Sequence, residues 1–143
     1  MNRFLSPLPI NEQTGIALIR ILVGIFMIYH GWETFDAAKI REYTTWDIFK
    51  SSSTPFFLVY MGKVSELVVG ILLVLGLFTR LACIILILTM SYIAFIVGGG
   101  KIWYDDQYPF LFAVLAFVFI FTGPGRWSLD GILFNKKTEA TRL

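Results

Sequence analysis

Residues 81–97 have the sequence LACIILILTMSYIAFIV and contain no charged side chain. An apolar run of this kind can cross a hydrocarbon core of about 30 Å as a helix. Three further apolar runs occupy residues 14–32, 55–78 and 108–122. The composition agrees with a lipid environment, because 57% of the residues are hydrophobic and only 15% are charged. The sequence therefore predicts one all-α integral membrane domain over residues 1–143, an antiparallel bundle of four transmembrane helices.

The only long connection between these runs is residues 33–54. In this segment Tyr43, Trp46 and Phe49 recur every three residues. Such spacing places the three aromatic side chains on one face of a helix, and an amphipathic helix of this kind lies in the membrane interface. We therefore expect a short interfacial helix between the first and second spans, and a polar tail that begins near Asn135.

The basic residues outside the spans indicate the orientation. The face that holds the termini carries six of them and the opposite face carries four: Arg3, Arg80, Arg126, Lys136, Lys137 and Arg142 against Lys39, Arg41, Lys50 and Lys101. Because cytoplasmic segments carry an excess of Lys and Arg, both termini are expected to be cytoplasmic. The first run lacks a small-residue cleavage site after it, so we expect it to be retained as a span.

Two of the apolar runs contain a charge. Counted from the ends nearest the long connection, Arg20 is 12 residues into its run and Glu66 is 11 residues into its own. At about 1.5 Å per residue, both would lie roughly 16–18 Å below that membrane face. An isolated charge near the bilayer centre costs about 2.5–3.5 kcal/mol on insertion scales. We therefore predict that Arg20 and Glu66 face inward and pair, with Lys63 one turn before Glu66 able to share the carboxylate.

Small residues lie beside both charges at helical spacing. Gly24 and Gly31 share a face with Arg20, and Gly62 and Gly70 share a face with Glu66. Small residues allow two membrane helices to approach closely, which favours contact between the first and second spans. Two interpretations of the charged cluster remain open, a structural clamp and a functional site.

A group of aromatic and titratable residues is predicted nearer the long connection: Tyr29, His30, Trp32 and Tyr60. With the cluster of charges, they could form a pocket for a quinone or another small molecule, and the alternative is that His30 is simply an interfacial residue. Cys83 and His30 are the only residues of their types. A thiol–disulfide shuttle and a bis-His haem within one chain are therefore excluded, and no residues show metal-ligand spacing.

Three stretches resemble the DoxX family of small bacterial membrane proteins. They are ALIRILVGIFMIYHGWETF at residues 17–35, VSELVVGILLVLGLFTRLA at residues 64–82 and GPGRWSLDG at residues 123–131. The resemblance implies a four-helix protein of the bacterial inner membrane. It also implies association with thiosulfate:quinone oxidoreduction or with thiol-redox enzymes, so that a quinone is an expected non-covalent ligand and a redox enzyme an expected partner.

The GPGRWSLDG stretch also has a predicted structural role. Gly123 and Gly125 would end the fourth span with a sharp turn, and Trp127 would lie in the headgroup layer. A pair between Arg80 and Asp130 would then fix the tail against the tight turn at residues 79–80. The alternative is a docking site for a soluble partner.

Three classes of function fit these residues. The first is an accessory or anchor subunit of a quinone-linked or thiol-redox membrane system, the second is a structural subunit of a larger membrane complex, and the third is a small-solute transporter. Four short helices leave little room for a solute path unless the protein forms a homo-oligomer. The net charge of +2 is too small and too scattered to indicate nucleic-acid binding.

Overall fold

The structure is a computed structural model that describes the backbone of residues 10–140 and the side chains of residues 10–134. All regular elements in this range are helical, so the predicted all-α class is confirmed. Three described helices are long and apolar enough to cross a membrane: Glu12–Phe35, Pro55–Leu75 and Thr79–Val97, with 24, 21 and 19 residues. Arg3 and Arg142, and the side chains of Lys136 and Lys137, lie outside the described residues.

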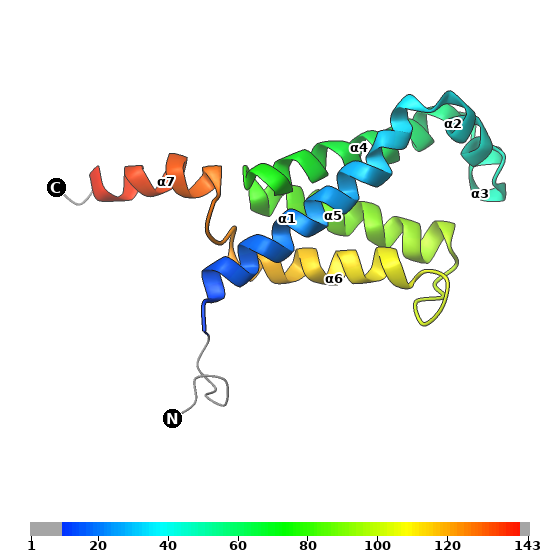
Figure 1. The fold of residues 1–143 in the computed structure, drawn as a ribbon. Helices are drawn as coiled ribbons and strands as arrows, with labels where there is room; N and C mark the ends of the chain where they lie inside the picture. Colours follow the sequence, from blue (N-terminus) through cyan, green and yellow to red (C-terminus); the bar gives the residue numbers. More distant parts are fainter. Residues whose placement is uncertain (1–9, 141–143) are drawn as a thin grey trace.

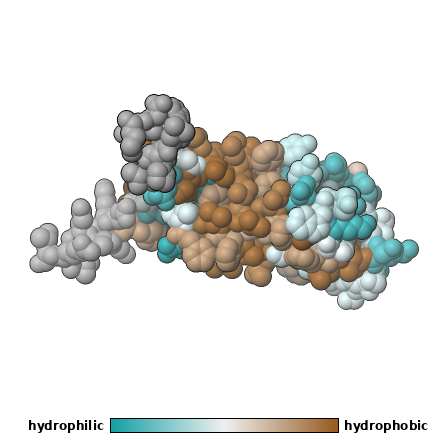
Figure 2. All heavy atoms as spheres, turned by 90° about the horizontal axis from the view of Figure 1, so that it is seen from below, coloured by the Kyte–Doolittle hydropathy of each residue, from teal (hydrophilic) through white to brown (hydrophobic). Residues whose placement is uncertain are grey.

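The elements follow one another as α1 (Glu12–Gly31), the 3-10 helix η2 (Trp32–Phe35), α2 (Ala37–Thr44), α3 (Asp47–Lys50), α4 (Pro55–Leu75), α5 (Thr79–Tyr92), the π-helix η3 (Ile93–Val97), α6 (Gln107–Thr122) and α7 (Leu129–Ala140). α1 packs on α4, and α5 packs on both α4 and α6. Figure 1 shows α2 and α3 at one end of these packed helices and α7 at the other. Apolar residues fill the middle of the face in Figure 2, with hydrophilic residues toward the ends.

The contact between α1 and α4 depends on glycine. A Cβ atom added at Gly24 would lie 2.8 Å from the backbone nitrogen of Val74, and one added at Gly70 would lie 2.6 Å from that of Ile28. Both distances are too short, so the two backbones can approach this closely only because these positions carry no side chain. Gly62, which the sequence grouped with Gly70, has open space where a Cβ would lie.

The first two turns of α4 extend past the end of α1. Glu33, just after α1, forms an ion pair with Lys63, so Pro55 lies eight residues beyond this level, about 12 Å along the α4 axis. The helices α2 and α3 cover this extension, with Ile40 and Phe49 packed in one buried cluster with Val59. Burial of these side chains fixes the connection between the two long helices onto α4.

Two predicted details were wrong. The connection forms two helices, because α2 ends at Thr44 and Trp46 has an extended backbone that lets Phe49 reach the cluster with Val59. The tight turn is at residues 76–78, because Gly76 adopts the left-handed conformation and ends α4. The backbone of the polar tail is helical as far as Ala140, where α7 ends.

A Gly70→Ala substitution tests the close contact between α1 and α4. We expect it to lower the free energy of unfolding by about 1–3 kcal/mol, because the added methyl group overlaps the α1 backbone. Gly62→Ala on the same helix is the matched control, and it should leave stability unchanged or raise it by up to about 1 kcal/mol. Unfolding in detergent micelles measures both variants, and equal effects would contradict the proposed packing.

Candidate functional site

Arg20 is fully buried, and its guanidinium contacts the segment just before α7. One terminal nitrogen of its guanidinium donates to the carbonyl oxygen of Leu73 at 2.6 Å, and more weakly to that of Val74 at 3.4 Å. The other donates to the carbonyl oxygens of Arg126 and Trp127 at 3.2 and 3.0 Å. The last carbonyls of a helix have no partner within the helix, so Arg20 stabilises the end of α4 and the turn before α7 together.

The predicted pair between Arg20 and Glu66 is therefore wrong. Arg20 is 13 residues before Glu33, whereas Glu66 is only three residues after its neighbour Lys63. The two charges thus lie roughly 15 Å apart along the helix axes. The prediction aligned the start of α4 with the end of α1, but the first two turns of α4 extend past α1 and are covered by α2 and α3.

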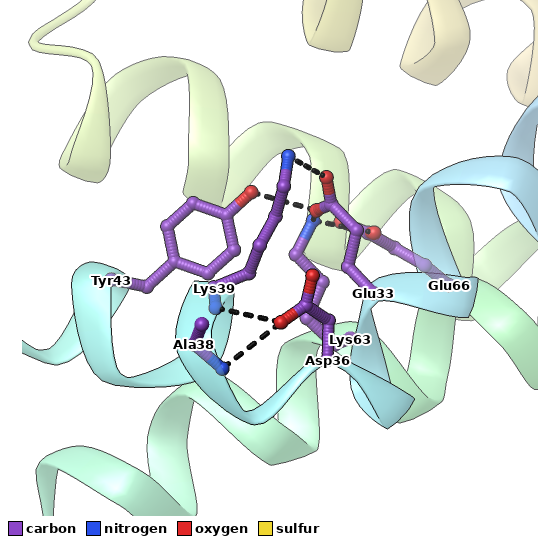
Figure 3. Close-up of polar contacts among 7 residues, drawn as sticks. All are labelled: Glu33, Asp36, Ala38, Lys39, Tyr43, Lys63 and Glu66. Atoms are coloured by element: carbon purple, nitrogen blue, oxygen red, sulfur yellow. Dashed lines mark hydrogen bonds and ion pairs between the residues drawn. The ribbon is translucent and has the colours of Figure 1, made fainter.

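Glu66 belongs to a second polar cluster at the other end, shown in Figure 3. The ammonium group of Lys63 lies 2.9 Å from Glu33 and 3.2 Å from Glu66. Lys39 also pairs with Glu33 at 2.9 Å, and the hydroxyl of Tyr43 donates to Glu33 at 2.7 Å. The cluster joins η2, α2 and α4, and its two carboxylates balance its two ammonium groups.

The two members of this cluster on α2 have shifted pKa values. Burial, with the hydrogen bond that its hydroxyl donates to Glu33, raises the pKa of Tyr43 above its usual value. The hydrogen bond from Lys39 to the Glu33 carboxylate raises the pKa of Lys39. Tyr43 therefore stays a hydroxyl donor and Lys39 a cation at neutral pH.

A groove of about 970 Å³ opens beside this cluster, and Glu33 and Lys39 form part of its wall. Its other lining residues are Ile25, Ile28, Tyr29, Trp32, Phe35, Asp36, Ala37 and Ala38. Tyr29 and Trp32 are more than half exposed, as is Phe35, whose ring packs edge-on against that of Trp32 with centroids 5.1 Å apart. The groove thus combines aromatic walls with a polar end.

Of the four predicted pocket residues, the structure brings only Tyr29 and Trp32 into this groove. His30 follows Tyr29 directly and is rotated by about 100° around the helix, outside the groove wall, with its ring centroid 5.5 Å from that of Tyr29 in an edge-to-face arrangement. Tyr60 lies on the part of α4 that extends beyond α1, outside the groove wall. Glu33, Lys39 and Tyr43 were not predicted as site residues, although two opposite charges and a tyrosine at the start of the connection were a signal in the sequence.

Asp130 does fix the tail to the turn between α4 and α5, but through a different partner from the one predicted. Its carboxylate accepts hydrogen bonds from the backbone amides of Phe78 and Thr79, at 2.7 and 2.8 Å. These amides open α5, where no side chain of the local segment forms a cap. Gly125 approaches α1 so closely that an added Cβ would lie 2.7 Å from the carbonyl oxygen of Gln13.

The fold and its apolar helices define an all-helical, multi-pass membrane protein. A model of the DoxX family matches residues 15–99, and the chain belongs to this family. It is 31% identical to a protein of Haemophilus influenzae described as uncharacterized, over 85% of this chain and 92% of the relative. It is 25% identical to the putative oxidoreductase CatD of Bacillus subtilis, over 87% of this chain and 91% of the relative. No solved structure matches the chain.

The separation of the two charged clusters can be tested with a double-mutant cycle. We expect Arg20→Met and Glu66→Gln each to destabilise the protein, with effects that add to within about 0.5 kcal/mol, since the two residues share no partner within residues 10–134. Lys63→Met combined with Glu66→Gln is the positive control, because these two residues form an ion pair and should couple. Unfolding in detergent measures both cycles, and strong coupling between Arg20 and Glu66 would contradict the structure.

Proposed function

We propose that this chain is a membrane-embedded accessory subunit of a redox system, and that it binds a quinone in the groove beside Glu33. The observation that carries this proposal is the groove itself, with Tyr29, Trp32 and Phe35 as aromatic walls and Glu33 and Lys39 at its polar end. A quinone has a flat ring with polar oxygens and a long apolar tail. Flat side chains with a few polar groups are the environment that such a ligand requires.

The position of the groove on α1 also suits a lipid-soluble ligand. Ile25 and Ile28 extend the groove toward the middle of the helix, while Lys39 lies beyond its end. Ile25 is about half exposed, on the side that lipid would contact. A ligand that enters from the bilayer could therefore place its tail along α1 and its headgroup at the level of Glu33.

The name of the Bacillus subtilis relative, a putative oxidoreductase, supports a redox role. The only cysteine of the chain, Cys83, is fully buried, so thiol chemistry would have to come from another protein. We therefore infer that the chain anchors or assists a redox enzyme that carries the reactive group.

We further propose that α6 crosses the membrane with the three longer helices, giving four antiparallel spans in a bacterial inner membrane. α6 has 16 residues, which is about 24 Å of helix. Three aromatic side chains before or at its start are largely exposed, as expected in the headgroup layer: Trp103, Tyr104 and Tyr108. With both termini cytoplasmic, α2 and α3 would face the periplasm.

A Trp32→Ala substitution tests the quinone site. We expect it to reduce the quinone that co-purifies with the protein in a mild detergent by at least about tenfold, because Trp32 forms one wall of the groove. Trp103→Ala is the matched control, since Trp103 is also an exposed tryptophan but lies outside the groove. Mass spectrometry of lipid extracts gives the measurement, and wild-type protein without quinone would contradict the proposal.

The orientation can be tested with single cysteines on a Cys83→Ser background. We expect a cysteine at Ser52 to react with a membrane-impermeant maleimide in intact spheroplasts, and a cysteine at Thr141 to react only after lysis. The basic residues on the two faces are the reason for this expectation. Labelling of the Thr141 position in intact spheroplasts would reverse the assignment.

A further inference from the structure

The polar end of the groove contains an ion pair whose hydrogen-bonding capacity is only partly used. Glu33 and Lys39 both line the groove, with 2.9 Å between Oε1 of Glu33 and the ammonium nitrogen of Lys39. The side chain of Glu33 is 20% exposed and that of Lys39 is 48% exposed. A ligand in the groove can therefore contact both groups without displacing the helices that carry them.

The groups around Glu33 stabilise its ionised carboxylate. Oε1 faces Lys39, whereas Oε2 accepts from the hydroxyl of Tyr43 and pairs with the ammonium group of Lys63 (Figure 3). Two positive charges and a hydroxyl donor around one carboxylate favour its charged form. An ionised carboxylate has no proton to donate, so toward a ligand Glu33 can act only as an acceptor.

The atoms that remain free define the ligand group that fits. Among the side chains that the structure describes, Oε1 of Glu33 has a single hydrogen-bond partner, Lys39, and a carboxylate oxygen can accept about two bonds. Lys39 uses one of its three N–H groups in that bond. A ligand oxygen placed beside both must donate to Glu33 and accept from Lys39. A hydroxyl group does both, whereas a carbonyl oxygen can only accept and would face the negative charge of Glu33.

Asp36 also favours a ligand group that can donate a hydrogen bond. It lines the groove, and its Oδ1 accepts from the backbone amides of Ala38 and Lys39 at the start of α2. Its carboxylate is thus a second acceptor at the polar end, with no donor of its own when ionised. Of the described residues that form the groove wall, Lys39 is the only cationic one.

We propose that the groove selects the reduced, hydroquinone form of its ligand over the oxidised quinone, and that Glu33 is the residue that determines this selectivity. This inference rests on the proposed function, because it assumes that the groove holds a quinone headgroup. The hydroxyl of the hydroquinone donates to Oε1 of Glu33 and accepts from the ammonium group of Lys39. No electron or proton is transferred in this step, which is one of binding alone.

The experiment compares the two oxidation states of one probe, decylubiquinone and decylubiquinol, with the full-length protein in lipid nanodiscs under anaerobic conditions. Isothermal titration should give an affinity for the reduced form about tenfold higher, which corresponds to about 1.4 kcal/mol. Glu33→Gln should bring the ratio close to one, because an amide can also donate to a carbonyl oxygen. Glu42→Gln is the matched control, since Glu42 is exposed on α2 and is not part of the groove wall.

A second measurement needs no variant. Tighter binding of the reduced form raises the midpoint potential of the bound probe, by about 30 mV for a tenfold preference in a two-electron couple. Equal affinities, or tighter binding of the oxidised form, would overturn the inference and leave the quinone site intact. A tenfold preference that persists in Glu33→Gln would overturn the role of Glu33. Failure of both forms to bind would instead overturn the proposed function.

Discussion

The guanidinium of Arg20 stabilises one end of the molecule by donating to carbonyl oxygens of two separate segments, the last turn of α4 and the turn before α7. Burial of this charge is costly, and several carbonyl dipoles offset the cost where a carboxylate would be the usual partner. Other contacts depend on the same arrangement. The backbone amide of Arg126 donates to the carbonyl oxygen of Gln13 on α1, and the carboxylate of Asp130 accepts from the backbone amides at the start of α5. One side chain thus organises the meeting point of α1, α4, α5 and the final segment.

The groove at the opposite end depends on how α1 and α4 are aligned along their axes. The close contact at Gly24 and Gly70 fixes how far α1 reaches along α4, and it leaves the first two turns of α4 uncovered. Burial of apolar surface then draws α2 and α3 over those turns. This places Lys39 and Tyr43 against Glu33, and Glu33 against Lys63. The groove is therefore a consequence of helix packing, and its polar end is assembled from three elements.

The sequence predicted the helical class, the family and the inward position of Arg20 and Glu66, because lipid penalises charge and backbone polarity wherever they occur. The penalty that lipid places on charge and on backbone polarity acts within each segment, whatever its partners in the fold. The partners of the two charges could not be predicted, since they depend on the register of α4 against α1. That register is fixed by the close contact at Gly24 and Gly70, which joins two helices separated by the long connection. Asp130 was correctly placed near the turn between α4 and α5, yet its bonds go to backbone amides, which leave no signature in a sequence.

The two charged clusters differ in how accessible they are to a ligand, and this difference separates a structural role from a binding role. Arg20 is fully buried and its charge faces carbonyl groups, so no ligand can reach it without opening the fold. The cluster around Glu33 has balanced charges, and two of its members are accessible from the groove. Balanced charge lowers the cost of keeping such groups near lipid, while partial exposure leaves hydrogen-bonding positions free for a ligand. The end that α2 and α3 cover therefore combines the accessible polar groups with the aromatic walls, whereas the Arg20 end holds the helices together.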